Sequence, residues 1–377
     1  MSIERALLHR LSVQVKPGKV LLLFGARRVG KTFLMRRLAE KFSKKTLFLN
    51  GEDSDTLALL HDRSIANYRR LLNGVQLLLI DEAQNIPDIG QKLKLMVDEI
   101  PHAAIVASGS SAFDLLNKTG EPLVGRSLPF CLHPFSQQEL STTENLLETK
   151  QNLPARLIYG AYPDVVLMSS DEQRAEYLRN IVSSYLLKDI LAVDGIRSSS
   201  KMQDLLRLIA FQVGSEVSFD ELGTQLGMSK NTVERYLDLL CKVFVVYRLR
   251  PYSQNLRKEI TSKSKWYFYD NGVRNAIINN FAPLALRKDE GALWENYLIA
   301  ERIKHMYNSG KYANLYFWRT YDAQEVDLIE EKNGVISAVE MKWGKKQPQA
   351  PVAFAKSYPQ ATYQVVNRSN YLNWINS

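Results

Sequence analysis

The sequence predicts an α/β protein with a doubly wound parallel sheet first, a winged helix-turn-helix second and a smaller α/β unit last. Three observations support this order. Short apolar runs alternate with amphipathic segments from residue 20 to about residue 134. Two helical patterns follow, separated by "GMS", and the C-terminal part reads as helix, three strands, helix and strand. Strands that alternate with helices are typical of a parallel sheet with crossover helices.

Five apolar runs in the first part are expected to be buried strands, with helices between them at 31–42 and 91–99. The runs are "VLLLF", "TLFLN", "LLLI", "AAIVAS" and "LPFCL". Residues 1–150 should therefore form the first domain. Residues 151–195 contain few turn signals, so a helical linker or lid is expected there.

The composition predicts a soluble cytoplasmic protein with an anionic partner. The chain has 377 residues and a formal net charge of +9, which suits DNA. Cys131 and Cys241 are far apart, so a disulfide framework or a cysteine zinc site is not expected. No apolar run approaches the roughly 18 residues of a membrane span. The charged start "MSIERALLHRL" does not resemble a signal peptide.

The stretch "GARRVGKT" fits the phosphate-binding pattern G-x-x-x-x-G-K-[ST], and it lies between a predicted strand and a predicted helix. Backbone N–H groups at such a turn bind the phosphates of ATP. Lys31 is expected to reach the β- and γ-phosphates, and Thr32 to bind Mg²⁺. The predicted nucleotide-binding residues are Gly25, Ala26, Arg27, Arg28, Val29, Gly30, Lys31, Thr32 and Phe33.

The stretch "LLLIDEAQ" places two acids at the end of a buried strand. Asp81 suits the Mg²⁺ shell, and Glu82 suits activation of the attacking water. In "VASGSS", Ser108 or Ser110 is a candidate sensor of the γ-phosphate, with Ser110 preferred, and a plain polar loop is the alternative. Arg126 in "GRSLPF" is either a finger that acts on a neighbour's nucleotide or a structural surface arginine.

Residues 196–264 are expected to form the winged helix-turn-helix, with "VFVVYRLR" in the wing. On its second helix, Lys230, Asn231 and Arg235 lie on the polar face and could reach a DNA groove. Basic residues of the wing suit phosphate contacts, because between 242 and 265 the only acid is Glu259. The wing candidates are Arg248, Arg250, Arg257 and Lys258. The alternative is a protein-docking module with a solvated charged face.

Asn333-Gly334 predicts a two-residue hairpin turn within residues 265–377, the expected last domain. That turn would place Asp327 opposite Glu340, with Lys342 on the same face. Like charges opposite one another are destabilising, and Mg²⁺ would relieve them. Glu295, on the preceding helix, could approach the same site. A cross-strand salt bridge between Lys342 and Glu325, with Glu340 exposed to water, explains the pattern equally well.

Together these motifs resemble a family of prokaryotic AAA-type ATPases with a C-terminal domain long described as of unknown function. The resemblance rests on "GARRVGKT", "LLLIDEAQ", "VASGSS", "GRSLPFCLHPFSQQE", "WEN", "FWRT…EVDLI" and "VEMKWG". The C-terminal part is similar to the PD-(D/E)xK nucleases. This implies catalytic roles for Asp327, Glu340 and Lys342 and a metal-binding role for Glu295. Ala26 departs from the family, since many relatives have proline there.

The resemblance also implies a homo-oligomer, such as a hexameric ring, with nucleotide at a subunit interface. The expected function is ATP-dependent binding and remodelling of branched, broken or single-stranded DNA. ATP would be hydrolysed to ADP and phosphate, and the C-terminal site would either cleave DNA with Mg²⁺ or bind it without cleavage. The alternative is a nucleotide-controlled signalling switch with an inactive nuclease-like scaffold.

Overall fold

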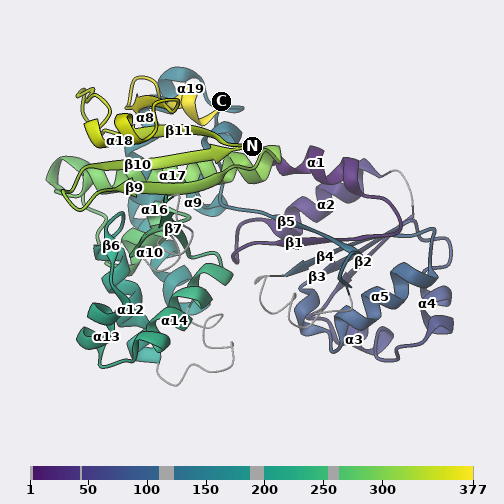
Figure 1. Ribbon diagram of the computed structural model, residues 1–377. Helices are drawn as coiled ribbons and strands as arrows, with labels where there is room; N and C mark the ends of the chain where they lie inside the picture. The colour runs from purple at the N-terminus through teal and green to yellow at the C-terminus, as the bar shows by residue number, and fades with distance from the viewer. Residues whose placement is uncertain (1–2, 43–44, 110–122, 187–198, 254–262, 377) are drawn as a thin grey trace. The chain divides into compact units, whose positions relative to one another are not determined.

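The computed structural model describes residues 3–42, 45–109, 123–186, 199–253 and 263–376 (Figure 1). The chain divides into two units. Unit 1 comprises Met1–His133 with two short pieces, Lys242–Phe244 and Tyr307–Ser309, and unit 2 comprises the remainder. Among the described residues, no helix is both long enough and apolar enough to cross a lipid bilayer.

Unit 1 is built on a five-stranded parallel sheet with the strand order β2-β3-β4-β1-β5. Each strand matches one of the predicted apolar runs, so the predicted parallel α/β sheet is confirmed. The strands are β1 (Val20–Phe24), β2 (Thr46–Asn50), β3 (Leu77–Asp81), β4 (Ala104–Gly109) and β5 (Ser127–Cys131).

Helices cover both faces of this sheet, with α2 and α5 on opposite sides in Figure 1. On the α5 side, Tyr68, Leu93 and Met96 pack with Leu22 and Leu78 of the strands in one buried cluster. The helices are α1 (Leu7–Gln14), α2 (Lys31–Lys41), α3 (Ser54–Leu59), α4 (Ile65–Leu71), α5 (Ile89–Glu99) and the 3-10 turn η1 (Ala83–Asn85). Crossover helices of this kind connect parallel strands and bury both faces of the sheet.

Unit 2 begins with helices, in agreement with the helical character predicted for the segment after residue 150. These are α7 (Gln137–Leu140), α8 (Leu146–Tyr159), α9 (Pro163–Leu167), α10 (Asp171–Asn180) and a π-helical turn, Ile181–Leu186. Ser136 and Asn145 each form a capping box at the starts of α7 and α8, which fixes where these helices begin.

The middle of unit 2 has the order helix, strand, two helices and two strands. The elements are α12 (Ser199–Phe211), β6 (Glu216–Val217), α13 (Phe219–Leu226), α14 (Lys230–Lys242), β7 (Val246–Pro251) and β8 (Ser264–Phe268). Gly227 ends α13 in the left-handed conformation, with φ +59°, which glycine adopts without strain. The two helices and their turn therefore lie where the sequence predicted them.

The last part of unit 2 has the predicted order of a long helix, three strands, a helix and a strand. These are α17 (Glu290–Ser309), β9 (Asn314–Arg319), β10 (Glu325–Lys332), β11 (Val335–Met341), α18 (Val352–Ser357) and β12 (Thr362–Val366). The sequence analysis did not predict α16 (Asn271–Ile277), the turn η4 (Leu284–Leu286) or α19 (Tyr371–Ile375).

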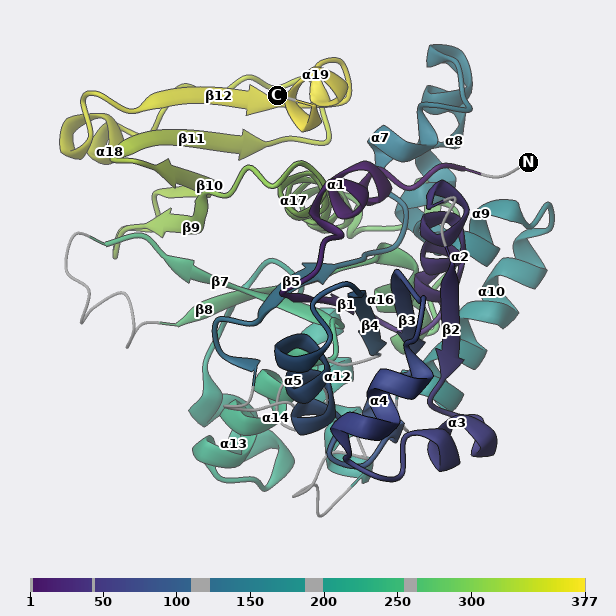
Figure 2. The same cartoon turned by 90° about the vertical axis from the view of Figure 1, so that its right-hand side faces the viewer.

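One seven-stranded sheet runs through the middle and last parts of unit 2, in the order β12-β11-β10-β9-β7-β8-β6 (Figure 2). Strand β7 joins the two parts. Its first four residues pair with β8, and Arg250 and Pro251 pair with β9. The expected boundaries at residues 150, 195 and 264 all fall inside unit 2, and the last one coincides with the start of β8.

Buried amides connect these parts further. Asn275 of α16 donates to the carbonyls of Leu157 and Ile158 at the end of α8, at 3.1 and 2.8 Å. Asn296 of α17 accepts from the Phe268 N–H at 2.6 Å and donates to its carbonyl at 3.1 Å. Each amide satisfies backbone groups that would be costly to bury without partners.

Candidate functional site

The phosphate-binding stretch forms the turn between β1 and α2. Gly25 and Gly30 have φ of +151° and +95°, and Arg28 has φ +65°. A Cβ atom at Gly25 would lie 2.2 Å from the Leu132 carbonyl oxygen, so only glycine fits there. The turn therefore places the first turn of α2 at the carboxyl edge of the sheet, where a helix N-terminus favours an anion.

The side chains predicted to contact ATP and Mg²⁺ lie around this turn. Lys31 Nζ donates to the carbonyls of Gly25 and Ala26, at 2.9 and 3.1 Å. Thr32 Oγ1 donates to Asp81 Oδ2 at 2.5 Å. A hydroxyl and a carboxylate beside a free helix N-terminus match the oxygen ligands that Mg²⁺ takes in phosphate sites. The residues present therefore fit Mg²⁺-ATP.

Hydrogen bonds fix both the backbone and the side chain of Glu82. Its N–H donates to Asp81 Oδ1 and to Ser108 Oγ, each at 3.2 Å, and its φ is +48°. Gln84 Nε2 donates to Glu82 Oε2 at 2.5 Å. Ser108 also donates to Asp81, so Ser108 belongs to the site. Ser110, the serine preferred from the sequence, lies outside the described residues.

The predicted hairpin forms between β10 and β11. Asn333 and Gly334 have φ of +53° and +82°, the backbone of a type I′ turn, and Lys332 pairs with Val335. The register continues to Leu328 opposite Val339. The next residues along the two strands are Asp327 and Glu340, and Asp327 Oδ2 accepts from the Met341 N–H at 2.7 Å.

Glu340 and Lys342 form an ion pair at the end of this hairpin. The other carboxylate oxygen of Glu340, Oε2, is buried and has no hydrogen-bond partner among the described residues. Glu325 pairs with Lys265 and lies 3.5 Å from Arg319. Lys342 and Glu325 therefore each pair with a different residue, so the alternative prediction of a salt bridge between them is wrong. Glu340 is buried rather than exposed to water.

Burial raises the pKa of Asp327 well above its usual value, and the nearby carboxylates of Glu295 and Glu340 raise it further. The positive charge of Lys265 acts in the opposite direction. Glu295 lies near the pair, as predicted, but it accepts from Tyr267 Oη at 2.5 Å and lies 3.5 Å from Lys265 Nζ. One of its two carboxylate oxygens, Oε1, is therefore already engaged.

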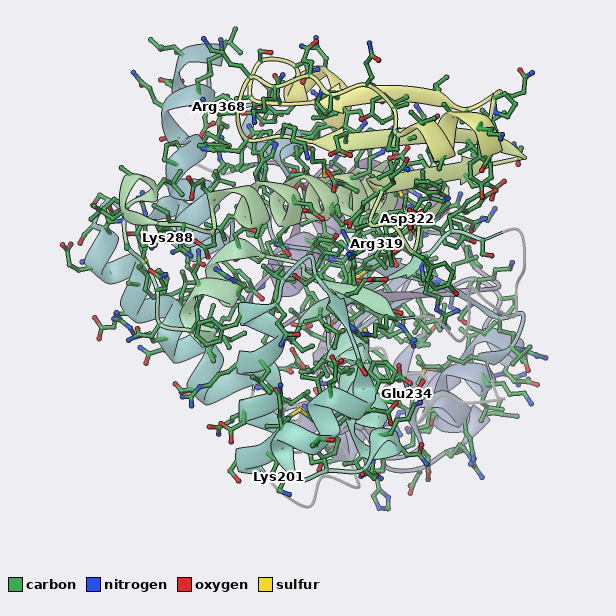
Figure 3. All side chains as sticks on the ribbon, turned by 60° about the vertical axis from the view of Figure 1, so that its left-hand side comes forward. Lys201, Glu234, Lys288, Arg319, Asp322 and Arg368 are labelled. Carbon is green, nitrogen blue, oxygen red and sulfur yellow. The ribbon has the colours of Figure 1, made fainter. Side chains whose placement is uncertain are left out.

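These contacts connect eight charged side chains, including Arg319 at the end of β9 (Figure 3). The acids are Glu216, Glu295, Glu325, Asp327 and Glu340, and the bases are Lys265, Arg319 and Lys342. We call this set the carboxylate cluster. With every group charged, five acids against three bases leave a formal charge of −2, the charge that one divalent cation would balance.

The donor atoms of the cluster suit Mg²⁺, which is commonly held by one or two carboxylates, waters and substrate phosphates. Within the part of the chain that the structure describes, Glu340 Oε2 lacks a partner, and burial and the nearby carboxylates raise the pKa of Asp327 even though Lys265 and the Met341 N–H act in the opposite direction. Across the described ranges, no three metal-ligating side chains gather closely enough to hold an ion. Asp327, Glu340 and Glu295 stay predicted ligands, and among them Glu295 already uses one oxygen for Tyr267 and Lys265.

Three family models match successive parts of the chain. Residues 17–141 match an AAA domain, residues 150–284 match a domain of unknown function, DUF8612, and residues 290–374 match another, DUF4143. The AAA match covers the phosphate-binding turn, Asp81 and Glu82. Unit 1 contains an AAA-type ATPase domain. The two other matches meet within unit 2, where the structure has a continuous sheet.

Similar proteins include uncharacterised proteins of two bacteria. One from Mycobacterium tuberculosis is 29% identical over 88% of this chain and 72% of its own length. One from Haemophilus influenzae is 25% identical over 84% of this chain and 80% of its own length. Identities at this level extend over both units, so the AAA-type domain and unit 2 occur together in these proteins.

Solved structures that resemble this chain include the following two. A signal-transduction ATPase with numerous domains and a tetratricopeptide repeat sensor, from Pyrococcus horikoshii, is 11% identical with a TM-score of 0.31, over 82% of this chain. This chain spans only 50% of that protein. The RuvB Holliday junction branch migration motor of Thermotoga maritima is 15% identical with a TM-score of 0.30, over 64% of this chain and 86% of its own. At these TM-scores neither likeness carries a conclusion.

Arg126 of the AAA-type domain precedes β5, at the amino edge of the parallel sheet. The phosphate-binding turn follows β1 and lies at the carboxyl edge. Arg126 therefore faces away from the nucleotide site of its own domain. Its Nε donates to Asp98 Oδ1 at 2.7 Å, and 41% of its side chain is exposed. A role toward its own ATP is excluded, and the role toward a neighbour's ATP stays a prediction.

On α14, the candidate DNA-contacting residues are exposed. Val233, Tyr236 and Leu237 face the core, while Asn231 and Arg235, one helical turn apart, face solvent. Lys230 is also exposed and lies 3.1 Å from Asp220. Arg250 is exposed at the end of β7. Arg257 and Lys258 lie outside the described residues.

Arg248 differs from the other candidates, because its side chain is only 17% exposed. Its Nε donates to Ser264 Oγ at 3.0 Å, and its guanidinium lies 5.3 Å from the Phe219 ring and 5.6 Å from the Trp266 ring. Glu234, labelled in Figure 3, is 3.9 Å away. Arg248 packs β7 against α13, so we remove it from the DNA-contacting candidates.

Sequence reasoning missed five residues around these sites: Gln84, which holds Glu82; Glu216, Lys265 and Arg319 of the carboxylate cluster; and Tyr267, which donates to Glu295. Gln84 is part of "DEAQ", so its spacing from Glu82 offered a local signal. Glu216, Lys265 and Tyr267 come from β6 and β8, far from the hairpin in sequence, and no short motif joins them to Asp327. Arg319 is close in sequence, since it ends β9 shortly before the hairpin begins at Glu325.

Proposed function

We propose that the protein is an ATP-driven DNA-processing enzyme that binds DNA through α14 and cleaves it at Asp327 and Glu340. The observation that carries the proposal is the buried, unpaired Glu340 Oε2 beside Asp327, in a cluster with a formal charge of −2. Such a pair calls for a divalent cation. Lys342, next to it, supplies a charge that suits a phosphate substrate.

In the AAA-type domain, ATP hydrolysis needs a water aligned with the γ-phosphate. Glu82 takes a proton from this water as its oxygen bonds to the γ-phosphorus, and the bond from that phosphorus to the β–γ bridging oxygen breaks. Lys31 and the N–H groups of the turn stabilise the charge that develops on the phosphate oxygens. Gln84, bonded to Glu82, fixes the direction of the carboxylate.

In unit 2, Mg²⁺ held by Asp327 and Glu340 would lower the pKa of a nearby water and polarise the phosphate. A water oxygen bonds to the phosphorus, and the bond from phosphorus to one sugar oxygen breaks. The proton lost by the water is balanced by a proton that the leaving oxygen takes from solvent. Lys342 donates a hydrogen bond to the phosphate and offsets the charge that builds up there.

The proposed winged helix consists of α12, β6, α13, α14, β7 and β8, with α14 as the helix that contacts DNA. Reversing Lys230 and Arg235 to Glu should weaken DNA binding for every sequence. The slope of log affinity against log salt should fall by about 0.9 for each lost phosphate contact. Filter binding or fluorescence anisotropy over a salt series would measure it.

The matched control is Lys288→Glu, an exposed charge reversal outside the proposed winged helix (Figure 3). It changes the net charge by the same amount per residue but should leave the slope unchanged. An unchanged slope in the Lys230→Glu/Arg235→Glu variant, with the fold intact, would place the DNA site elsewhere.

Arg126 is proposed to act on the nucleotide of a neighbouring subunit in a homo-oligomer. Arg126→Ala alone should lose most ATP turnover. Mixing it with Lys31→Ala should restore about a quarter of the wild-type rate. In random assembly, that share of interfaces pairs an intact phosphate-binding turn with an intact arginine. Steady-state ATPase assays on mixtures measure this, and no recovery in stable mixed oligomers would rule out the trans role.

The whole proposal is tested by measuring ATPase rate and DNA cleavage with single-stranded, duplex and branched DNA, with and without Mg²⁺. DNA-stimulated turnover and Mg²⁺-dependent cleavage are expected. A nucleotide-driven change of oligomeric state that DNA does not affect, without any cleavage, would instead favour a signalling switch with an inactive C-terminal scaffold.

A further inference from the structure

A buried lysine, Lys265, lies within the carboxylate cluster although it is no part of the D…E-x-K pattern. Only 2% of its side chain is exposed. Its Nζ pairs with Glu325, lies 3.5 Å from Glu295 Oε1 and is 5.3 Å from the Phe317 ring centroid. A buried charge is costly unless it is paired, so the position of Lys265 depends on these carboxylates.

Lys265 separates the acids of the cluster into two groups. Glu295 and Glu325 contact Lys265 through Oε1, whereas Glu340 pairs with the half-exposed Lys342 through one oxygen, and its other oxygen has no partner in the described part of the chain. Asp327 accepts one backbone hydrogen bond, from Met341. Asp327 and Glu340 are therefore the acids of the cluster that Lys265 does not contact.

Strand β8 fixes Glu295 through two of its residues. Lys265 and Tyr267 are two positions apart, so they point to the same side of the strand. Tyr267 Oη donates to Glu295 Oε1 at 2.5 Å, the same oxygen that lies 3.5 Å from Lys265 Nζ. Trp266, between them, packs against Phe219 of α13 with ring centroids 6.2 Å apart. One strand thus connects the cluster with the helices of the proposed winged helix.

We propose that Lys265 is a positioning residue of the carboxylate cluster. It binds Glu295 and Glu325 and so restricts the cluster to a single divalent cation, held by Asp327 and Glu340. This inference rests on the proposed function, since it assumes that the cluster binds a cation. Lys265 itself contacts neither the cation nor the phosphate.

Removing the charge of Lys265 has an unusual expected effect, because it should strengthen cation binding. Lys265→Met changes the formal charge of the cluster from −2 to −3 and removes one cationic partner each from Glu295 and Glu325, which keep Tyr267 and Arg319 as neighbours and can turn toward a cation. Mn²⁺ should bind roughly tenfold more tightly, as the loss of a nearby positive charge in a poorly solvated site predicts. DNA cleavage should nevertheless fall, because the added ligands draw the cation away from Asp327 and Glu340.

The experiment is a calorimetric titration of the nucleotide-free, full-length protein with Mn²⁺ alone. Glu340→Gln serves as the reference, and its heat is subtracted so that only binding at the cluster is counted. Lys265→Arg, which keeps the charge, should retain wild-type affinity. Lys332→Met, an exposed lysine at the far end of the same hairpin, is the matched charge control and should also leave the affinity unchanged.

If wild type shows no Glu340-dependent Mn²⁺ binding, the proposed metal site fails and this inference fails with it. If wild type binds Mn²⁺ but Lys265→Met binds it equally or more weakly, only the positioning role is overturned. Lys265→Gln, whose amide can still donate to Glu325, replaces Lys265→Met if the latter does not fold. Tighter Mn²⁺ binding with slower cleavage is the result that supports the role.

Discussion

Lys31→Ala is expected to abolish ATP turnover while leaving the fold of both units intact. The Lys31 ammonium group donates to two backbone carbonyls of the phosphate-binding turn, those of Gly25 and Ala26. In the transition state it would offset charge on the transferred phosphoryl group. Loss of one such group typically costs roughly 10²- to 10³-fold in rate. A coupled phosphate-release assay measures the loss of ATP turnover, and a thermal melt measures whether the fold is intact.

Glu82→Gln separates hydrolysis from binding. It removes the proton acceptor but keeps the shape, and the hydrogen bond to Gln84 can persist, so ATP should bind and remain uncleaved. Arg69→Gln, which removes an exposed ion pair with Glu99 on the same domain, is the matched control and should turn over ATP normally. ATP hydrolysis at the parent rate in Glu82→Gln would show that another group activates the water.

Glu340→Gln is expected to abolish both DNA cleavage and the divalent-cation response of the protein, without affecting ATP hydrolysis. In the full-length wild type, Mg²⁺ or Mn²⁺ should raise the melting temperature of unit 2, because a cation that binds only the folded state stabilises it. Glu340→Gln neutralises one of the two acids that would hold the cation, so this increment should disappear. Differential scanning calorimetry at several cation concentrations would follow it.

The matched variant is Glu330→Gln. Glu330 is also a buried acid of the hairpin, but it lies on β10 and pairs with Arg302 at 2.6 and 2.7 Å. It should lower stability and keep the cation increment. Comparing Glu330→Gln with Glu340→Gln distinguishes the effect of losing any buried charge from the effect of losing a metal ligand. An identical cation increment in wild type and Glu340→Gln would mean that the hairpin holds no metal.

The features that could be predicted from the sequence are those set by local geometry. The phosphate-binding turn needs glycine at Gly25 and Gly30, where the backbone has positive φ. The hairpin register follows from Asn333-Gly334 together with the two-residue alternation of a strand, so the register that ends with Leu328 opposite Val339, next to Asp327 and Glu340, could be predicted. Each of these depends on residues close in sequence.

The features that could not be predicted depend on pairing between distant segments. Nothing near Lys265 indicates that β8 pairs with β6 and β7, or that its side chain reaches Glu325 on β10. Arg248 could not be assigned correctly for the same reason. A basic residue on a predicted wing suggests a phosphate contact, but in the structure Arg248 packs over the rings of Phe219 and Trp266. Long-range contacts such as these decide whether a charged side chain is free to bind a ligand or is already paired within the protein.

The continuous sheet of unit 2 has a consequence for how this protein can change over evolutionary time. A deletion or recombination point at residue 265 would cut β8 and leave β7 and β6 without their partner. The segment carrying the hairpin therefore cannot be discarded without damaging the helices before it. A descendant protein that no longer needs DNA cleavage would lose this activity by substitution of Asp327 or Glu340. The whole hairpin would remain in that protein as a structural part of the sheet.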